Sequence, residues 1–217
     1  MAGEMSSREE ILRRVRAATG GVSTAEAAQA GWGAVPRRYK REGVLERELV
    51  LELLEDRLRD YDATVVRTER EDVARSVAGR LSERGKKRMV VPAGLMGEWL
   101  PQGFEFVVDE GLSSMELNGF DGVVTGATVA IAETGTVVVQ NIAGQGRRAV
   151  TLVPDYHLCL VRVADVVETV PEAMDRLRAT AGLATTFVSG PSATADIEMT
   201  RIKGVHGPRY LDVILIS

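Results

Sequence analysis

The pattern of hydrophobic and polar positions divides the chain into a helical beginning and an alternating remainder. Apolar residues at helical spacing predict a first helix, which Ser6 or Ser7 can cap. A broader stripe of Val and Leu predicts a second helix at 44–61. The stretch between them has no regular pattern and contains glycines, a proline and a basic run. We therefore expect an N-terminal helix and connector arm over 1–43 and an α/β domain over 44–217.

Beyond residue 61, short apolar runs alternate with helical patterns. Several runs are apolar throughout, such as Val-Ile-Leu-Ile near the C-terminus, so they predict strands that are buried on both faces. The predicted strands and apolar runs are 63–67, 88–91, 104–108, 121–125, 137–139, 149–153, 157–163, 185–189 and 210–216. The predicted helices are 70–84, a short one begun by Ser113 and Glu116, and one from Thr169 to Gly182. This alternation indicates an α/β fold with a mostly parallel sheet flanked by helices.

One polar turn lies between two apolar runs and is the first candidate for chemistry. Small residues at 127–132 have helical propensity, and Glu133, Thr134, Gly135 and Thr136 then turn the chain. Loops at strand ends of an α/β sheet collect the groups that bind ligands, so Glu133 is a candidate acid, base or nucleophile. Partial burial in the turn would raise the pKa of its carboxyl. The alternative is a buried hairpin, in which the glycine supplies the turn and Glu133 satisfies backbone donors.

A second polar loop follows the strand predicted at 185–189. Ser192 and Thr194 can cap a helix that starts near Thr194, and Gly190 precedes them. Free amide groups at a helix start bind anions, so these residues and Asp196 are candidates for holding a carboxylate or phosphate. The alternative is ordinary capping, with Asp196 in the first helical turn.

The chain has two histidines, and neither lies in a metal-binding motif. His206 stands in a glycine turn before the last strand, where it could move a proton or simply lock the loop by a hydrogen bond. His157 starts a strand, which favours a structural role. Because the two have no short metal-ligand spacing, we expect no metal ion, and no motif predicts a cofactor.

A glycine loop with the letters of a dinucleotide fingerprint spans Gly144-x-Gly146-x-x-Ala149. The fingerprint must open a helix, whereas residues 149–153 are predicted to be a strand, so we reject a Rossmann site. Arg147 and Arg148 could contact an anion, although such a pair more often keeps a loop solvated.

Composition narrows the classes of function. The 217 residues carry a net charge of −4, which argues against a nucleic-acid binder. The charged N-terminus does not fit a signal peptide, and no apolar run is long enough to span a membrane, so we expect a cytoplasmic protein. The single cysteine, Cys159, excludes an iron–sulfur cluster held by cysteines of this chain alone.

Four motifs that occur in order carry a resemblance to a known family. They are Ala-Ile-Ala-Glu-Thr-Gly-Thr at 130–136, Leu-Val-Pro-Asp-Tyr-His at 152–157, Ser-Gly-Pro-Ser-Ala-Thr-Ala-Asp-Ile-Glu at 189–198 and Gly-Val-His-Gly-Pro at 204–208. Together they resemble the LUD-domain family of lactate utilization proteins, in particular its protein C group, formerly DUF162. The resemblance implies a fold like that of the NagB/RpiA/CoA-transferase group, which includes 5-formyltetrahydrofolate cyclo-ligase. It also implies a role beside two iron–sulfur partner proteins in oxidising L-lactate to pyruvate.

The main hypothesis joins this resemblance to the two polar loops. We expect the Glu133 turn and the Gly190 loop to enclose a small carboxylate or phosphorylated ligand, with His206 at the edge. The Glu133-x-Gly135 pattern is similar to the catalytic Glu-x-Gly of some CoA transferases. Two alternatives stay open: a non-catalytic assembly or regulatory subunit, and an autonomous enzyme similar to a folate cyclo-ligase or a CoA transferase.

Overall fold

The computed structural model describes residues 6–20, 24–194, 202–204 and 206–217. The chain forms two compact units, Met1–Tyr39 and Lys40–Ser217. Each unit is described by itself below. The division predicted after residue 43 stays a prediction.

The first unit is helical. Helix α1 (Ser7–Ala18) begins with a capping box between Ser6 and Glu9. The stretch that the sequence predicts as an irregular connector contains a second helix, α2 (Ala25–Ala34), so that prediction is wrong. The Thr24 side chain caps α2, whose five alanines favour a helix in spite of the glycines that suggested a loop. Neither helix buries any of its residues.

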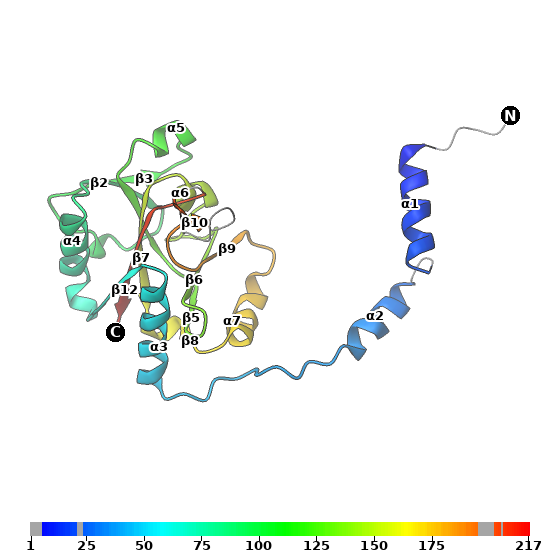
Figure 1. Ribbon diagram of the computed structural model, residues 1–217. Coiled ribbons are helices and arrows are strands. Elements are labelled where there is room, and N and C mark those ends of the chain that lie inside the picture. The colour runs from blue at the N-terminus through cyan, green and yellow to red at the C-terminus, as the bar shows by residue number, and fades with distance from the viewer. Residues whose placement is uncertain (1–5, 21–23, 195–201, 205) are drawn as a thin grey trace. The chain divides into compact units, whose positions relative to one another are not determined.

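The second unit is built on a parallel sheet of six strands, which confirms the α/β prediction (Figure 1). The spatial order is β1-β12-β7-β4-β2-β3, and each neighbouring pair is parallel. The strands are β1 (Thr64–Thr68), β2 (Arg88–Pro92), β3 (Glu105–Asp109), β4 (Gly122–Gly126), β7 (Tyr156–Arg162) and β12 (Tyr210–Ile216). Because β12 inserts between β1 and β7, this strand lies inside the sheet, next to the edge strand β1.

A smaller sheet packs beside the first and has the order β8-β5-β6-β9. Its strands are β5 (Val129–Ile131), β6 (Thr136–Gln140), β8 (Val166–Val167) and β9 (Thr185–Val188). The helical propensity assigned to 127–132 is therefore misleading. Strand β5 pairs with β6 on one side and β8 on the other, and this pairing overrides a weak local preference.

Helices cover both faces of the large sheet. The α-helices of this unit are α3 (Arg47–Asp60), α4 (Val73–Glu83), α5 (Ser114–Leu117), α6 (Arg148–Leu152) and α7 (Val170–Leu177). Single 3-10 turns are η1 (Arg70–Asp72), η2 (Gly97–Trp99), η3 (Val163–Asp165) and η4 (Arg178–Thr180). Helix α4 packs on one face, whereas α3 and the inner side of the small sheet share the core of the other face. Helix α7 covers the outer side of the small sheet.

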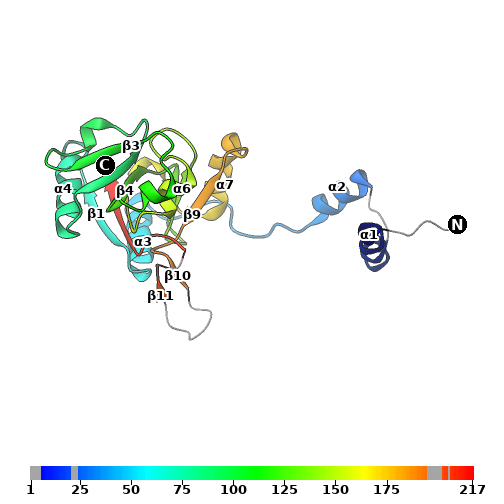
Figure 2. The ribbon, with the colours of Figure 1, turned by 90° about the horizontal axis from the view of Figure 1, so that it is seen from above.

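Two local predictions fail near the later candidate loops. Residues 149–153 were expected to be a strand, but α6 is a helix whose Val150 packs on Val90 and Val123 of the large sheet. A short apolar run does not distinguish a strand from a buried helix, which explains the error. The helix expected to start at Thr194 is also wrong there, because Ala193–Thr194 form strand β10, paired with β11 (Ile202–Lys203). Figure 2 shows this strand pair extending from the end of β9.

Candidate functional site

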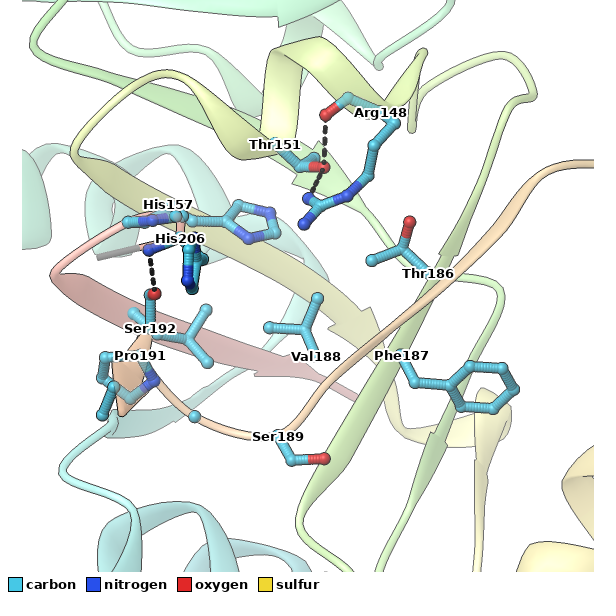
Figure 3. A pocket seen from close by; sticks show the side chains of 15 residues that line it. Arg148, Thr151, His157, Thr186, Phe187, Val188, Ser189, Pro191, Ser192 and His206 are labelled. Carbon is cyan, nitrogen blue, oxygen red and sulfur yellow. Dashed lines mark hydrogen bonds between the residues drawn. The ribbon is translucent and has the colours of Figure 1, made fainter. Parts of the chain in front are cut away.

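A pocket of about 240 Å³ lies where the two sheets approach each other (Figure 3). Helix α6 and the first residues of β7 form one side, and β9 forms the other. The segments that lead into β10 and β12 complete it. Its lining contains no carboxylate among the described residues: Arg148, Thr151, His157, Thr186, Phe187, Val188, Ser189, Gly190, Pro191, Ser192, Ala193, His206, Gly207, Pro208 and Leu211.

Arg148 supplies a positive charge to this pocket. It is the first residue of α6, and its guanidinium donates a hydrogen bond of 3.2 Å to Thr151, one turn further along. Within the described part of the chain no carboxylate pairs with it. The neighbouring Arg147 instead forms two hydrogen bonds of 2.8 Å with Asp109 and holds the pKa of that carboxyl below its ordinary value. Of this adjacent pair, Arg148 is thus the residue left to bind an anion.

His157 forms part of the pocket wall although only 1% of its surface is exposed. Its Nε2 atom lies 2.8 Å from the hydroxyl of Thr125, which in turn bonds the thiol of Cys159. Burial and the nearby charge of Arg148 lower the pKa of His157 to about 4, so the ring is neutral at pH 7. Burial also raises the pKa of the Cys159 thiol to about 12, which makes it a poor nucleophile.

The loop after β9 places three of the predicted site residues together. Gly190 has a φ of +83°, and a side chain there would meet Tyr61. The hydroxyl of Ser192 accepts a hydrogen bond of 3.1 Å from the backbone amide of His206. Gly190, Ser192 and His206 therefore line one pocket, and their roles in binding a ligand stay predictions. Asp196 and the side chain of Thr194 lie outside the described residues.

The Glu133 turn reaches the edge of the pocket through its hydroxyl groups, but its carboxylate does not line the pocket. The Thr136 hydroxyl lies 2.7 Å from that of Thr134 and 2.7 Å from that of Ser189, which is a lining residue. The Glu133 side chain is 40% exposed and pairs with Lys40 at 3.5 Å. The turn joins two antiparallel strands, which is the hairpin alternative considered from the sequence. The burial expected for Glu133 is thus limited.

Lys40 belongs to a second polar cluster that fastens the start of this unit. The buried carboxylate of Glu168, next to β8, pairs with Lys40 and accepts hydrogen bonds of 2.7 Å from the amides of Val44 and Leu45. Burial alone would raise the pKa of Glu168, but these bonds lower it below the ordinary value. These contacts hold the segment around Lys40 against the Glu133 turn and Glu168. We call this cluster the clamp.

The glycine loop at 141–147 opens a different hollow, at the carboxyl ends of β2 and β3. Gly144 and Gly146 both have φ near +77° there, and α6 does follow them. The reason given for rejecting a dinucleotide fingerprint, a strand at 149–153, is therefore wrong. Helix α6 is only five residues long, so the loop still does not open the long helix of a Rossmann unit.

Sequence reasoning undervalued Arg148 and His157. In the sequence Arg148 is one of two adjacent loop arginines, and only the fold shows that its neighbour is neutralised by Asp109. The position of His157 at the start of a strand predicts a structural role. The sequence feature that points to His157 is a polar ring at the start of an otherwise apolar run. A buried polar side chain of this kind has a hydrogen-bond partner or a functional role.

Comparisons with known proteins identify relatives of this chain. A family model described as the LUD domain matches residues 114–216. A Lactate utilization protein C of Deinococcus radiodurans is 42% identical over 176 residues, which is 80% of this chain and 82% of that one. A Lactate utilization protein C of Bacillus subtilis is 29% identical over 251 residues, covering 99% of this chain and 98% of that one.

A solved structure extends the comparison to three dimensions. It is the crystal structure of a DUF162 family protein from Deinococcus radiodurans, with a TM-score of 0.71 and 38% sequence identity. The likeness covers 80% of this chain and all of that one. Within the described residues, no helix is both long enough and apolar enough to cross a bilayer. The matching family model, the identity to a relative over most of both chains and the shared fold show that the chain belongs to the LUD-domain family. This family includes the lactate utilization C proteins.

Proposed function

We propose that this chain is the component without an iron–sulfur cluster in an L-lactate utilization system, and that its pocket binds a small carboxylate. The relatives named Lactate utilization protein C support the first part. The observation that carries the second is Arg148, a guanidinium directed into a pocket whose described lining contains no acidic side chain. A guanidinium binds a carboxylate through two parallel hydrogen bonds.

The remaining lining suits a ligand of a few carbon atoms. The hydroxyls of Thr151, Thr186 and Ser192 can bond its oxygen atoms, and Val188 and Leu211 can contact its carbon atoms. The volume of about 240 Å³ lies below the range typical of drug-sized ligands. The same donors would accept a phosphorylated ligand, which a binding experiment with inorganic phosphate distinguishes.

Redox chemistry is assigned to partner proteins in this proposal. Electrons from lactate would pass to iron–sulfur partners, and the chain's single cysteine, which is buried and bonded to Thr125, is given no redox role. Catalytic roles for Glu133 and His206 remain proposals. His206 lies exposed in the pocket lining, whereas Glu133 lies outside that lining.

Titration calorimetry with L-lactate, pyruvate and phosphate tests the pocket. We expect one carboxylate site, and we expect Arg148→Gln to weaken binding by at least tenfold, because a charged hydrogen-bond donor is lost. Arg75→Gln is the matched control, since Arg75 lies on the surface of α4 and pairs with Asp72 of the same segment. Absence of heat with every ligand, or equal affinity in Arg148→Gln, would contradict the proposal.

The assembly alternative has its own experiment. Copurification with the iron–sulfur proteins of the same system is measured for the unaltered chain, Arg148→Gln and Glu133→Gln. If the chain is only a scaffold, both variants copurify and sustain lactate oxidation. If the pocket acts in the reaction, Arg148→Gln copurifies but fails to sustain oxidation. Turnover by the purified chain alone would instead favour an autonomous enzyme similar to a CoA transferase or folate cyclo-ligase.

A further inference from the structure

The two units of the chain carry net charges of opposite sign. Residues 1–39 contain six arginines and four glutamates, and the rest of the chain contains 21 basic and 27 acidic residues. The first unit therefore has a net charge of +2 and the second a net charge of −6. Surfaces of opposite charge favour association and exclude partners of like charge.

Helix α1 presents an apolar face, and none of its residues is buried. Ile11 and Val15 lie four residues apart on one side of the helix and are 60% and 52% exposed. Leu12 extends this face. Arg8 lies one turn before Ile11, and Arg16 lies one turn after Leu12, so two guanidinium groups border the apolar side chains. Within the described residues, neither arginine has an ion-pair partner.

The outward side of α3 has the same spacing with the opposite charge. Leu45 and Leu49 are 41% and 49% exposed, and Leu53 continues their four-residue spacing. Glu46 lies one turn before Leu49, and Glu52 lies one turn after it. No described residue forms an ion pair with either of these carboxylates. The second unit thus exposes an apolar stripe bordered by unpaired negative charges, which we call the α3 face.

We propose that α1 of one copy of this chain packs on the α3 face of a second copy, which returns the same contact. Two stripes with a spacing of four residues can interdigitate their apolar side chains. Arg8 and Arg16 would then lie opposite Glu46 and Glu52 at the rim. A two-fold exchange closes on itself, so it covers both apolar faces of both copies. The interface does not depend on the identity of the ligand in the pocket.

The clamp and the size of the contact both favour an exchange between copies. The clamp fixes Lys40, Val44 and Leu45 to the second unit, so the first unit continues from a point beside the start of α3. A two-fold axis near α3 brings that point in each copy next to the α3 face of the other. A single pair of such helix faces is small beside the roughly 1,200 Å² of a stable interface, and the exchange doubles the buried area.

Sedimentation equilibrium of the full-length chain at several protein concentrations tests the exchange. We expect the unaltered chain to be in equilibrium between monomer and dimer. Arg8→Glu with Arg16→Glu gives the α1-reversed chain, and Glu46→Arg with Glu52→Arg gives the α3-reversed chain. Each change places like charges opposite one another in both contacts, so each should raise the dissociation constant of the dimer about tenfold or more.

A matched control separates the rim charges from net charge. Arg70→Glu with Arg75→Glu alters the net charge as much as the α1-reversed chain does, at exposed positions on η1 and α4. It should leave the dissociation constant nearly unchanged. A monomeric unaltered chain would overturn the proposal, because the first unit would then dock on its own chain or on a different molecule. A dimer that survives either reversal would also overturn it.

Mixing the two reversed chains tests whether the contact joins different copies. In the mixture an acidic α1 meets a basic α3 face in one contact, and a basic α1 meets an acidic α3 face in the other. We expect a heterodimer to form although each reversed chain alone is monomeric, and its formation also shows that both chains fold. A mixture that stays monomeric would contradict the exchange. Because the contact joins two folded copies, it adds to the free energy of unfolding only above the dissociation constant.

Discussion

At the scale of single residues, this protein holds several polar side chains inside its core by giving each a partner. His157 bonds Thr125, and Asp212 bonds both Arg84 and Tyr156. Unpaired, such groups would cost several kcal/mol of folding free energy. Loss of a partner, or a change in protonation, should therefore change the free energy of unfolding.

The pH dependence of unfolding should contain a contribution from His157. Its pKa falls from the ordinary value of 6.5 to about 4 in the folded protein, so between these values the unfolded chain binds a proton that the native state does not. This contribution is complete above pH 6.5 and is lost as the pH falls toward 4, at about 1 kcal/mol per pH unit. Urea unfolding of the unaltered chain and His157→Gln from pH 7.5 to 5 measures it. Parallel curves over that range would contradict the prediction.

Asp212 should matter more to stability than its tyrosine partner. The Asp212 carboxylate is fully buried, and Arg84 donates to it at 2.6 and 3.2 Å. Asp212→Ala should cost about 3 kcal/mol, because it leaves the arginine without its buried counter-charge. Tyr156→Phe should cost about 1 kcal/mol, the value of one hydrogen bond. Asp56→Ala, at an exposed position on α3, is the control for urea unfolding. A smaller loss for Asp212→Ala than for Tyr156→Phe would reject this order.

At the scale of elements, glycines allow close packing where a strand turn meets a helix. Gly135 in the β5–β6 turn and Gly85 after α4 have similar φ values, +57° and +63°. A Cβ atom at Gly135 would lie 2.8 Å from the backbone of Arg57, whereas one at Gly85 would meet no atom within 4 Å.

This pair separates backbone strain from crowding. Gly85→Ala should cost about 1 kcal/mol, from the left-handed conformation alone. Gly135→Ala should cost about 3 kcal/mol, because overpacking against the end of α3 is added to the strain. The two free energies of unfolding are compared by urea denaturation. Equal losses would mean that the turn can move away from α3 at little cost.

The segment before α3 depends on one carboxylate at the β8–α7 corner. Glu168 accepts the amide protons of Val44 and Leu45 and pairs with Lys40. Glu168→Gln should raise the hydrogen-exchange rates of those two amides about tenfold or more, because bonds to a charged acceptor are the stronger ones. Glu52→Gln, exposed on α3, should leave them unchanged. Unchanged exchange in Glu168→Gln would show that the clamp does not depend on the charge.

At the scale of the whole molecule, the two units differ in what they bury. The helices of Met1–Tyr39 bury none of their residues, whereas the core clusters are drawn from residues 50 to 216. Deletion of residues 1–39 should therefore change the free energy of unfolding of Lys40–Ser217 by no more than about 0.5 kcal/mol. Urea denaturation of both forms measures this. A larger loss would mean that the helical unit contributes to the fold of the second.

The LUD-domain resemblance and the parallel α/β sheet were available from the sequence alone. Fully apolar runs and capping boxes such as Ser113 with Glu116 are local signals, and the structure confirms them. Four short motifs in order were enough to indicate the family. The motifs lie largely in loops, where the residues that serve a family's function are concentrated.

Only the tertiary structure decided which residues share a pocket. The strand at 129–131 and the helix at 148–152 form because of what they pack against, so local preference predicted both wrongly. Arg147 and Arg148 are indistinguishable in the sequence until Asp109, which is 38 positions from Arg147, neutralises one of them. The hydrogen bonds that orient His157 likewise join residues more than thirty positions apart. Chemistry at this site thus depends on contacts between distant segments, which a local sequence pattern does not contain.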